Sequence, residues 1–91
     1  MDFIVENNKV YLNNELGELL AEVTFPNISE YVVEINHTFV DESLRGQGIA
    51  SKLLEMAANK IKEDGKKAKP TCSYAVNWFE KHESYWDLLS L

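Results

Sequence analysis

The sequence predicts an α+β domain in which a mixed, mostly antiparallel sheet of five strands carries two main helices. Four short apolar runs, separated by turn-forming residues, occupy the first 40 residues and favour strands. A glycine-containing turn and a long amphipathic pattern follow, and a further strand and helix complete the order. With 91 residues, the chain is expected to form one domain spanning residues 1–91.

The composition argues against several classes of protein. The formal net charge of -6 disfavours general binding to nucleic acid or to an anionic membrane. One cysteine cannot form an internal disulfide, and no apolar run approaches the roughly 18 residues that a membrane-spanning helix needs. The N-terminus has no basic and apolar targeting pattern. We therefore expect a cytoplasmic protein that binds neither nucleic acid nor membrane.

The first three strands are expected at residues 3–6, 9–12 and 18–25. Asn7 and Asn8 suit a two-residue turn, because asparagine tolerates positive φ. Apolar and polar residues alternate along the third run, which is typical of a half-buried strand. Short connections between the runs predict antiparallel pairing.

The fourth and longest strand is expected at residues 31–40. In a regular strand, one face would carry Tyr31, Val33, Ile35, His37 and Phe39. That face would make His37 the one polar side chain among apolar neighbours. A bulge within the strand would instead turn His37 to the other face.

The long helix is expected at residues 47–64. Its apolar stripe consists of Ala50, Leu53, Leu54, Ala57, Ala58 and Ile61. A fifth strand at residues 68–72 should lie parallel to the fourth, through a right-handed crossover. A second helix is expected at residues 74–82, capped by Ser73. The apolar tail at residues 85–91 is expected to pack against the sheet.

The turn between the fourth strand and the long helix carries the clearest indication of function. Gly46 and Gly48 leave the backbone bare where the chain enters a helix, whose first N–H groups and positive dipole end attract anions. We predict that Arg45 and the turn bind a pyrophosphate, with Arg45 adding charge. The backbone amides expected to bind it belong to Gly46, Gln47, Gly48, Ile49 and Ala50. The alternative is an ordinary strand-to-helix turn.

In this context the turn resembles the signature of the GNAT superfamily of N-acetyltransferases. That signature, Gln/Arg-x-x-Gly-x-Gly/Ala, stands here as Arg45-Gly46-Gln47-Gly48-Ile49-Ala50. The resemblance covers residues 18–85 and implies a minimal GNAT-like fold of the compact, single-domain subgroup. It implies an acetyl-CoA-dependent N-acetyltransferase with an amine acceptor and no metal. It also implies that pantetheine lies between the fourth and fifth strands, against main-chain groups of Phe39 and Val40.

The second motif of the family, Asn-x-x-Ala-x-x-Leu-Tyr-Glu-Lys, falls on residues 72–81. The matching positions are Ala75, Glu80 and Lys81. Cys72 replaces the asparagine, and Phe79 replaces the tyrosine that commonly protonates the leaving CoA thiolate. The two helices that shape the acceptor pocket in full-size members are missing here. The acceptor is therefore left open, as a small-molecule amine or an amine of a peptide or protein.

Two residues are candidates for catalysis. Cys72 should end the fifth strand just before a helix, and a helix N-terminus favours a thiolate. We predict that Cys72 attacks the thioester and carries the acetyl group. The alternatives are a structural cysteine and a sulfur that lines the acetyl pocket. His37 is the candidate base for the acceptor amine or the thiol, Glu34 is its rival, and a structural histidine is the alternative.

Two other functions remain alternatives to the transferase. The missing tyrosine and acceptor helices favour a non-catalytic CoA-binding module, a sensor or interaction domain. A slow acyl-CoA thioesterase would use water as the acceptor. Lys66, Lys67 and Lys69 are candidates for binding the 3′-phosphate of CoA, although a charge run of this kind is more often solvated.

Overall fold

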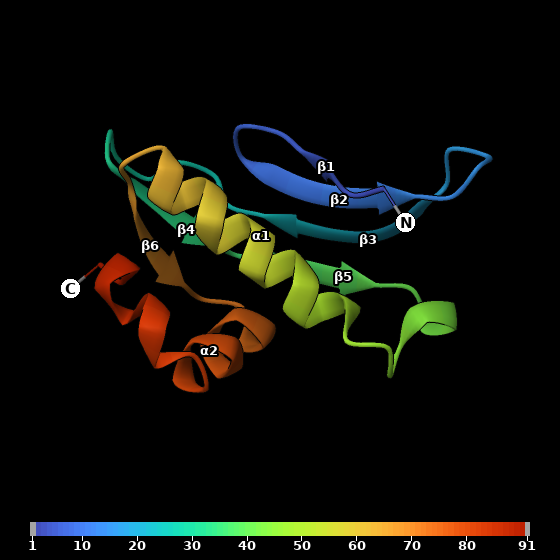
Figure 1. The fold of residues 1–91 in the computed structure, drawn as a ribbon. Helices are drawn as coiled ribbons and strands as arrows, with labels where there is room; N and C mark the ends of the chain where they lie inside the picture. The colour runs from blue at the N-terminus through green and yellow to red at the C-terminus, as the bar shows by residue number, and fades with distance from the viewer. Residues whose placement is uncertain (1, 91) are drawn as a thin grey trace.

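The computed structural model describes residues 2–90 and confirms the mixed α+β fold (Figure 1). Six strands replace the predicted five. The strands are β1 (Ile4–Val5), β2 (Lys9–Asn13), β3 (Leu19–Thr24), β4 (Val32–Ile35), β5 (His37–Val40) and β6 (Lys67–Pro70). The main helices are α1 (Ile49–Glu63) and α2 (Ser73–Glu80), and two 3-10 segments are η1 (Glu42–Leu44) and η2 (Glu83–Leu88).

The first three strands pair antiparallel as predicted, and β5 extends their sheet to the order β1-β2-β3-β5. The turn at Asn7 and Asn8 is closed by a 2.8 Å hydrogen bond from the Glu6 N–H to the Lys9 carbonyl. The apolar face of the third run is buried as predicted, at Ala21, Val23 and Phe25. This face forms the floor on which α1 packs.

The predicted fourth strand is broken at Asn36 into β4 and β5. At the break, the Asn36 N–H donates to the Thr24 carbonyl at 3.3 Å, and the Thr24 hydroxyl donates to Asn36 Oδ1 at 2.7 Å. These bonds hold Asn36 against β3 and shift the alternation of faces. Ile35 is buried before the break and Val40 after it, whereas His37 is exposed. A regular strand was therefore the wrong expectation, and the bulge alternative describes the chain better.

The break separates two sheets. β4 pairs parallel with β6, which confirms the predicted parallel pair, and β5 pairs antiparallel with β3. The strand expected at residues 68–72 ends at Pro70. Beyond it, the Thr71 and Cys72 N–H groups both donate to the Ile35 carbonyl, at 3.0 and 3.2 Å. Pairing stops there, so β5 and the chain that follows β6 diverge.

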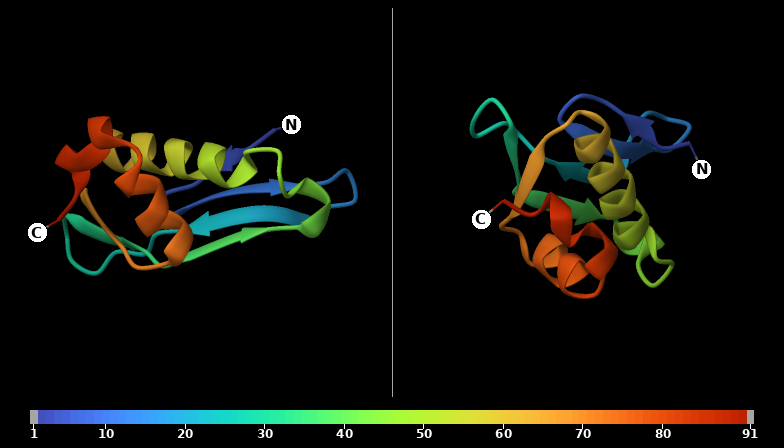
Figure 2. Two further views of the ribbon diagram at one scale, coloured as in Figure 1. Left: turned by 90° about the horizontal axis from the view of Figure 1, so that it is seen from below. Right: turned by 60° about the vertical axis from the view of Figure 1, so that its left-hand side comes forward.

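Both helices cover the same face of the sheet and leave its other face without a helix (Figure 2). α1 begins at Ile49 rather than at residue 47, because Gly48 has a positive φ. Its buried stripe contains Ile49, Leu53, Leu54, Ala57, Ala58 and Ile61, so Ile49 takes the place expected for Ala50. Cys72, not Ser73, is the N-cap residue of α2.

The tail packs on the sheet as predicted. Leu88 is buried, and Leu89 bridges to Ala68 beside β6. Leu91, also assigned to this tail, lies outside the described residues. Within residues 2–90, no helix combines the length and apolar character needed to cross a membrane.

Replacing Leu53 with alanine should destabilise the fold strongly. Leu53 is 0% exposed in the centre of the α1 stripe, and truncating such a leucine costs about 3 kcal/mol through lost burial and a cavity. Urea unfolding measures this change. Leu19→Ala is the control, because Leu19 is 41% exposed and its loss should cost within about 0.5 kcal/mol. Equal losses for the two variants would contradict this description of the core.

Candidate functional site

The turn before α1 presents unpaired backbone amides. Gly46 has a φ of 82° and Gly48, the N-cap of α1, a φ of 74°, both in the left-handed region. A Cβ at either glycine would meet nothing within 4 Å. Glycine is therefore required by the left-handed backbone conformation and not by crowding from neighbouring atoms. The first helical bond runs from the Lys52 N–H to the Gly48 carbonyl at 3.1 Å. The three preceding amides, residues 49–51, have no partner within the helix and no capping side chain.

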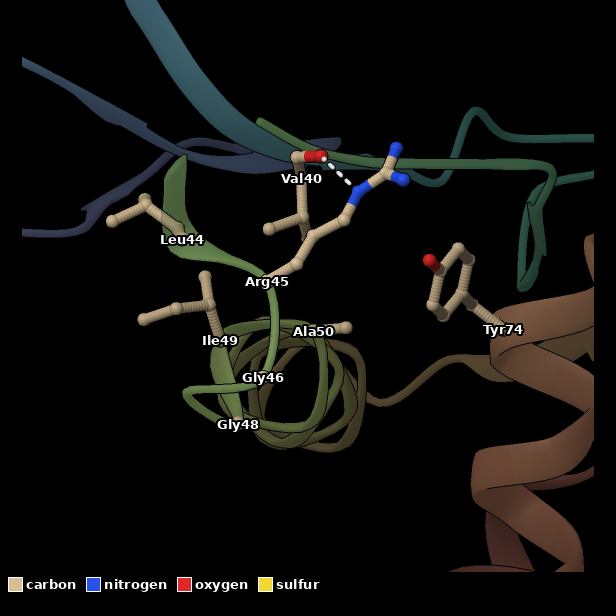
Figure 3. Close-up of a pocket in the computed structure, with 8 residues that line it drawn as sticks. All are labelled: Val40, Leu44, Arg45, Gly46, Gly48, Ile49, Ala50 and Tyr74. Atoms are coloured by element: carbon tan, nitrogen blue, oxygen red, sulfur yellow. Dashed lines mark hydrogen bonds between the residues drawn. The ribbon is translucent and has the colours of Figure 1, made fainter. Parts of the chain in front are cut away.

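Two of these residues, Ile49 and Ala50, line a pocket of about 180 Å³ (Figure 3). Its lining consists of Val40, Leu44, Arg45, Gly46, Gly48, Ile49, Ala50 and Tyr74. Arg45 Nε donates to the Val40 carbonyl at 3.4 Å, which leaves the other guanidinium N–H groups available. Tyr74 reaches from α2 toward Ala50 and Arg45 (Figure 3). The predicted turn residues thus surround one pocket, apart from Gln47, whose side chain donates to the Ser43 carbonyl at 3.4 Å.

Asp41 fixes the approach to this turn. Its Oδ2 accepts hydrogen bonds from the Ser43 hydroxyl at 2.6 Å and from the Ser43 N–H at 3.0 Å. The hydroxyl bond first, then the backbone bond and the charge of Arg45, hold the pKa of Asp41 below its ordinary value of 3.8. The ionised carboxylate is therefore the form that stabilises η1.

Asp41→Asn should remove a pH-dependent part of the stability. Because the pKa of Asp41 is lower in the folded than in the unfolded chain, its contribution is present above pH 3.8. It is lost as the pH falls through the lower, folded-state pKa. We expect the wild-type advantage over Asp41→Asn to shrink below pH 3.8 in acid unfolding curves. Parallel curves for the two proteins would contradict this role for Asp41.

The open edge of β5 points toward the chain that diverges after β6. The Asp41 N–H donates to the Leu20 carbonyl of the neighbouring strand β3 at 2.7 Å. Main-chain groups alternate along an antiparallel strand, so Phe39 also turns its main chain to β3, opposite Glu22. Thr38 and Val40 therefore turn theirs to the open edge. The main-chain groups available to pair with pantetheine therefore belong to Thr38 and not to the predicted Phe39. Val40 is available as predicted.

Cys72 lies where the two strands diverge. Its Sγ is 3.3 Å from Oγ1 of Thr38, across the gap between α2 and β5. Cys72 is a free, half-buried cysteine, and its carbonyl accepts the Val76 N–H at 3.0 Å as α2 begins. The side chain makes no capping bond to the helix, so the sulfur stays directed at Thr38. Sequence reasoning missed Thr38, because its facing depends on the break at Asn36.

His37 is not brought together with Cys72. The break turns His37 to the sheet face without helices, where its Nε2 lies 3.9 Å from Oε1 of Glu22. The rival base Glu34 lies on this outer face as well, because its neighbours along β4 face the core, and it accepts the Thr71 hydroxyl at 2.7 Å. Both candidate bases are therefore on the side of the sheet opposite α1 and α2.

Two further positions considered from the sequence, Phe79 and the lysine cluster at residues 66–69, do not contribute to this site. Phe79 is 3% exposed and packs edge-on against Trp78, so this position offers no acid. The predicted lysine cluster begins beyond the far end of α1, roughly 20 Å of helix from the glycine turn. There, Lys66 donates to Asn27 Oδ1 and Lys67 to the Asp87 carbonyl. The structure therefore favours the solvated alternative for this cluster.

The chain is similar to one protein family and to several solved structures. The family model described as GCN5-related N-acetyl-transferase matches residues 9–88. The NMR structure of a GCN5-like protein from Staphylococcus aureus is 31% identical, with a TM-score of 0.79 over 98% of this chain and 87% of that one. The crystal structure of an acetyltransferase from Bacillus cereus is 26% identical, with a TM-score of 0.67 over 89% of this chain and 56% of that one.

A third solved structure shares the fold alone. It is the ribosomal-protein-alanine N-acetyltransferase of Brucella melitensis biovar Abortus, 20% identical, with a TM-score of 0.59 over 91% of this chain and 62% of that one. The comparison with curated proteins gave no match. The family match spans most of the sequence, including the glycine turn and Cys72. The chain belongs to the GCN5-related N-acetyltransferase family, enzymes that transfer an acetyl group from acetyl-CoA to an amine.

Proposed function

We propose that this chain acetylates an amine with acetyl-CoA held between the glycine turn and Cys72. The observation that carries the proposal is the order of three features along one path. The unpaired amides of α1 come first, the open main-chain edge of Thr38 and Val40 follows, and the Cys72 sulfur lies at the far end. Acetyl-CoA has the same order, from pyrophosphate through pantetheine to thioester.

The pyrophosphate would bind at the turn because positive charge converges there. Ile49 and Ala50, at the start of α1, line the pocket, so the positive end of the helix dipole lies beside it, and Arg45 adds a full charge. One guanidinium N–H is already held by the Val40 carbonyl, which fixes the side chain at the pocket wall. The remaining N–H groups would donate to phosphate oxygens.

The pantetheine arm would pair with β5 as an added strand. Its two amide groups carry N–H donors and carbonyl acceptors like those of a peptide, and Thr38 and Val40 offer main-chain groups on the open edge. Pairing in this direction leads away from α1 and toward Cys72. Binding of the pyrophosphate and pantetheine would therefore position the thioester beside the Cys72 sulfur, and no separate residue is needed to bind the thioester.

At Cys72 we propose transfer in two steps. The thiolate attacks the carbonyl carbon of the thioester, the bond from that carbon to the CoA sulfur breaks, and CoA leaves as a thiolate that takes up the proton lost by Cys72. Thr38, 3.3 Å from Sγ, would donate its hydroxyl hydrogen bond to the thiolate. The acceptor amine then attacks the acetyl carbon, the Cys72 thiolate leaves, and the amine loses a proton.

The acceptor would approach from the sheet face that carries no helix. Figure 2 shows α1 and α2 on one face of the sheet, where the proposed cofactor path would also lie. His37 and Glu34 belong to the other face. We propose His37 as the base for the acceptor amine rather than for Cys72. The contact of Thr38 with the thiol supports this assignment, because neighbouring strand residues point to opposite faces.

The proposal is tested by incubating the chain with acetyl-CoA and two acceptors, a polyamine and a lysine-containing peptide. Free CoA thiol and acetylated amine are followed together, and equal amounts of the two are expected with at least one acceptor. Release of CoA thiol without acetylated amine would show that the chain is a thioesterase and not a transferase. Binding without thiol release would leave a non-catalytic CoA-binding module, and absence of binding would overturn the whole proposal.

A further inference from the structure

The outer face of the sheet carries a carboxylate between two aromatic residues. In the registers of β2, β3 and β5, Glu22 stands directly opposite Tyr11 on one side and Phe39 on the other. Residues opposite each other on neighbouring strands share a face, with Cβ atoms about 5 Å apart. The residues on either side of Glu22 along β3 are buried in the core, so this row faces away from α1. His37, the proposed base, lies on the same face.

The charge of Glu22 lacks a permanent counterion. Its side chain is 20% exposed, and a carboxylate so far withdrawn from water is unfavourable unless a cation accompanies it. Within residues 2–90, its one charged partner would be His37, whose Nε2 lies 3.9 Å from Oε1. A base must be neutral to accept a proton, and a neutral imidazole leaves the carboxylate uncompensated. A cation bound beside His37 would therefore be attracted to Glu22.

The aromatic residues beside Glu22 favour a cation as well. The face of an aromatic ring attracts an ammonium that lies within about 6 Å of the ring centroid. Such a contact already exists at Tyr11, where Lys9 Nζ lies 4.9 Å from the ring centroid. Lys9 pairs with Glu6 at 3.8 Å and not with Glu22, so it leaves the central carboxylate free of a lysine partner. This combination of a carboxylate and two aromatic residues suits an aliphatic ammonium.

We propose that the acceptor is a short aliphatic diamine or polyamine, whose first amine is acetylated beside His37 while Glu22 holds its second. This inference rests on the proposed function, which makes His37 the base for the acceptor. The imidazole and the carboxylate are 3.9 Å apart, and each hydrogen bond to them spans about 3 Å. The two nitrogens would therefore lie roughly 4–8 Å apart, the reach of about three to five methylene groups. The second ammonium keeps its proton and takes no part in the transfer.

The test compares two acceptors for acetyl-CoA, putrescine and the amino alcohol in which a hydroxyl replaces one of its amines. Both offer a primary amine on a four-carbon chain, but only putrescine offers a second cation. In wild type, kcat/KM per amino group should be about tenfold higher for putrescine, as expected for a charge-assisted contact. Glu22→Gln keeps the shape of the side chain and removes its charge, so this preference should disappear.

Glu30→Gln is the matched control. It removes the same charge from the β3–β4 loop, at the end of β4 remote from His37, and should retain the preference. Because the preference is a ratio within each protein, a general loss of activity in Glu22→Gln would not change it. Equal kcat/KM for the two acceptors in wild type, a preference that survives Glu22→Gln, or one that Glu30→Gln abolishes would overturn the assignment of the acceptor. Acetyl transfer would stand in these cases, whereas acetylation of neither amine, nor of a lysine-containing peptide, would overturn both proposals.

Discussion

Acetyl-CoA is expected to add one acetyl group to the wild-type chain and none to Cys72→Ala. Cys72 is the one cysteine of the sequence, and its sulfur lies at the end of the proposed cofactor path, 3.3 Å from the Thr38 hydroxyl. Without an acceptor amine the acetylated cysteine should accumulate. Intact-protein mass spectrometry after a single turnover measures the adduct. Neutral hydroxylamine should remove it, since it cleaves a thioester but spares an acetylated lysine.

Two further variants separate the steps of this mechanism. His37→Gln should form the adduct at the wild-type rate, because His37 faces the side of the sheet opposite Cys72. Transfer of the acetyl group to an amine should slow by about 10²-fold or more, because the proposed base for the amine is removed. Thr38→Val keeps the shape of the side chain and removes the hydroxyl, so adduct formation should slow while amine transfer from a formed adduct continues. An adduct on Cys72→Ala, or none on wild type, would exclude the acetyl-cysteine.

Gly48→Val should weaken acetyl-CoA binding by at least tenfold. A β-branched residue at a φ of 74° strains the backbone by about 1–3 kcal/mol, so the turn would rearrange and its amides would no longer converge on the pocket. Titration calorimetry with acetyl-CoA measures the loss. The effect should exceed that of any surface substitution outside the turn.

Gly17→Val provides a matched control for this variant. Gly17 has a φ of 80°, and an added Cβ there would also meet nothing within 4 Å, but the residue lies in the β2–β3 turn. The two variants should therefore lose similar stability, whereas only Gly48→Val should lose affinity. Equal affinity losses would show that binding reports general destabilisation rather than the geometry of the turn.

The local elements of this fold are largely predictable from sequence patterns. Alternation identified the buried face of β3, helical spacing identified five of the six buried residues of α1, and the glycines located the turn before α1. Each of these patterns reflects interactions between residues that are near in sequence. The parallel pairing of β4 with β6 followed from the long helical connection between them.

The break at Asn36 was not predictable in the same way. No glycine or proline marks it, and the bonds that hold it come from Thr24, on another strand. That single break decides the face of His37, the partner of Cys72 and the main-chain edge offered by Thr38. The pocket lined by Ser51, Leu54 and Trp78 likewise depends on how α1 and α2 pack together, which their separate periodicities do not determine.

Titrating the ¹⁵N-labelled chain with CoA, and following its amide resonances, tests directly whether the cofactor lies along the proposed path from the turn to Cys72. We expect shifts along the whole proposed path, at the turn residues Gly46, Gly48 and Ala50, at Thr38 and Val40, and at Cys72. Resonances of the remote β1–β2 turn at Asn7 and Asn8 should stay in place. Shifts confined to other surfaces, or shifts at the turn without any at β5 and Cys72, would contradict the proposed cofactor path.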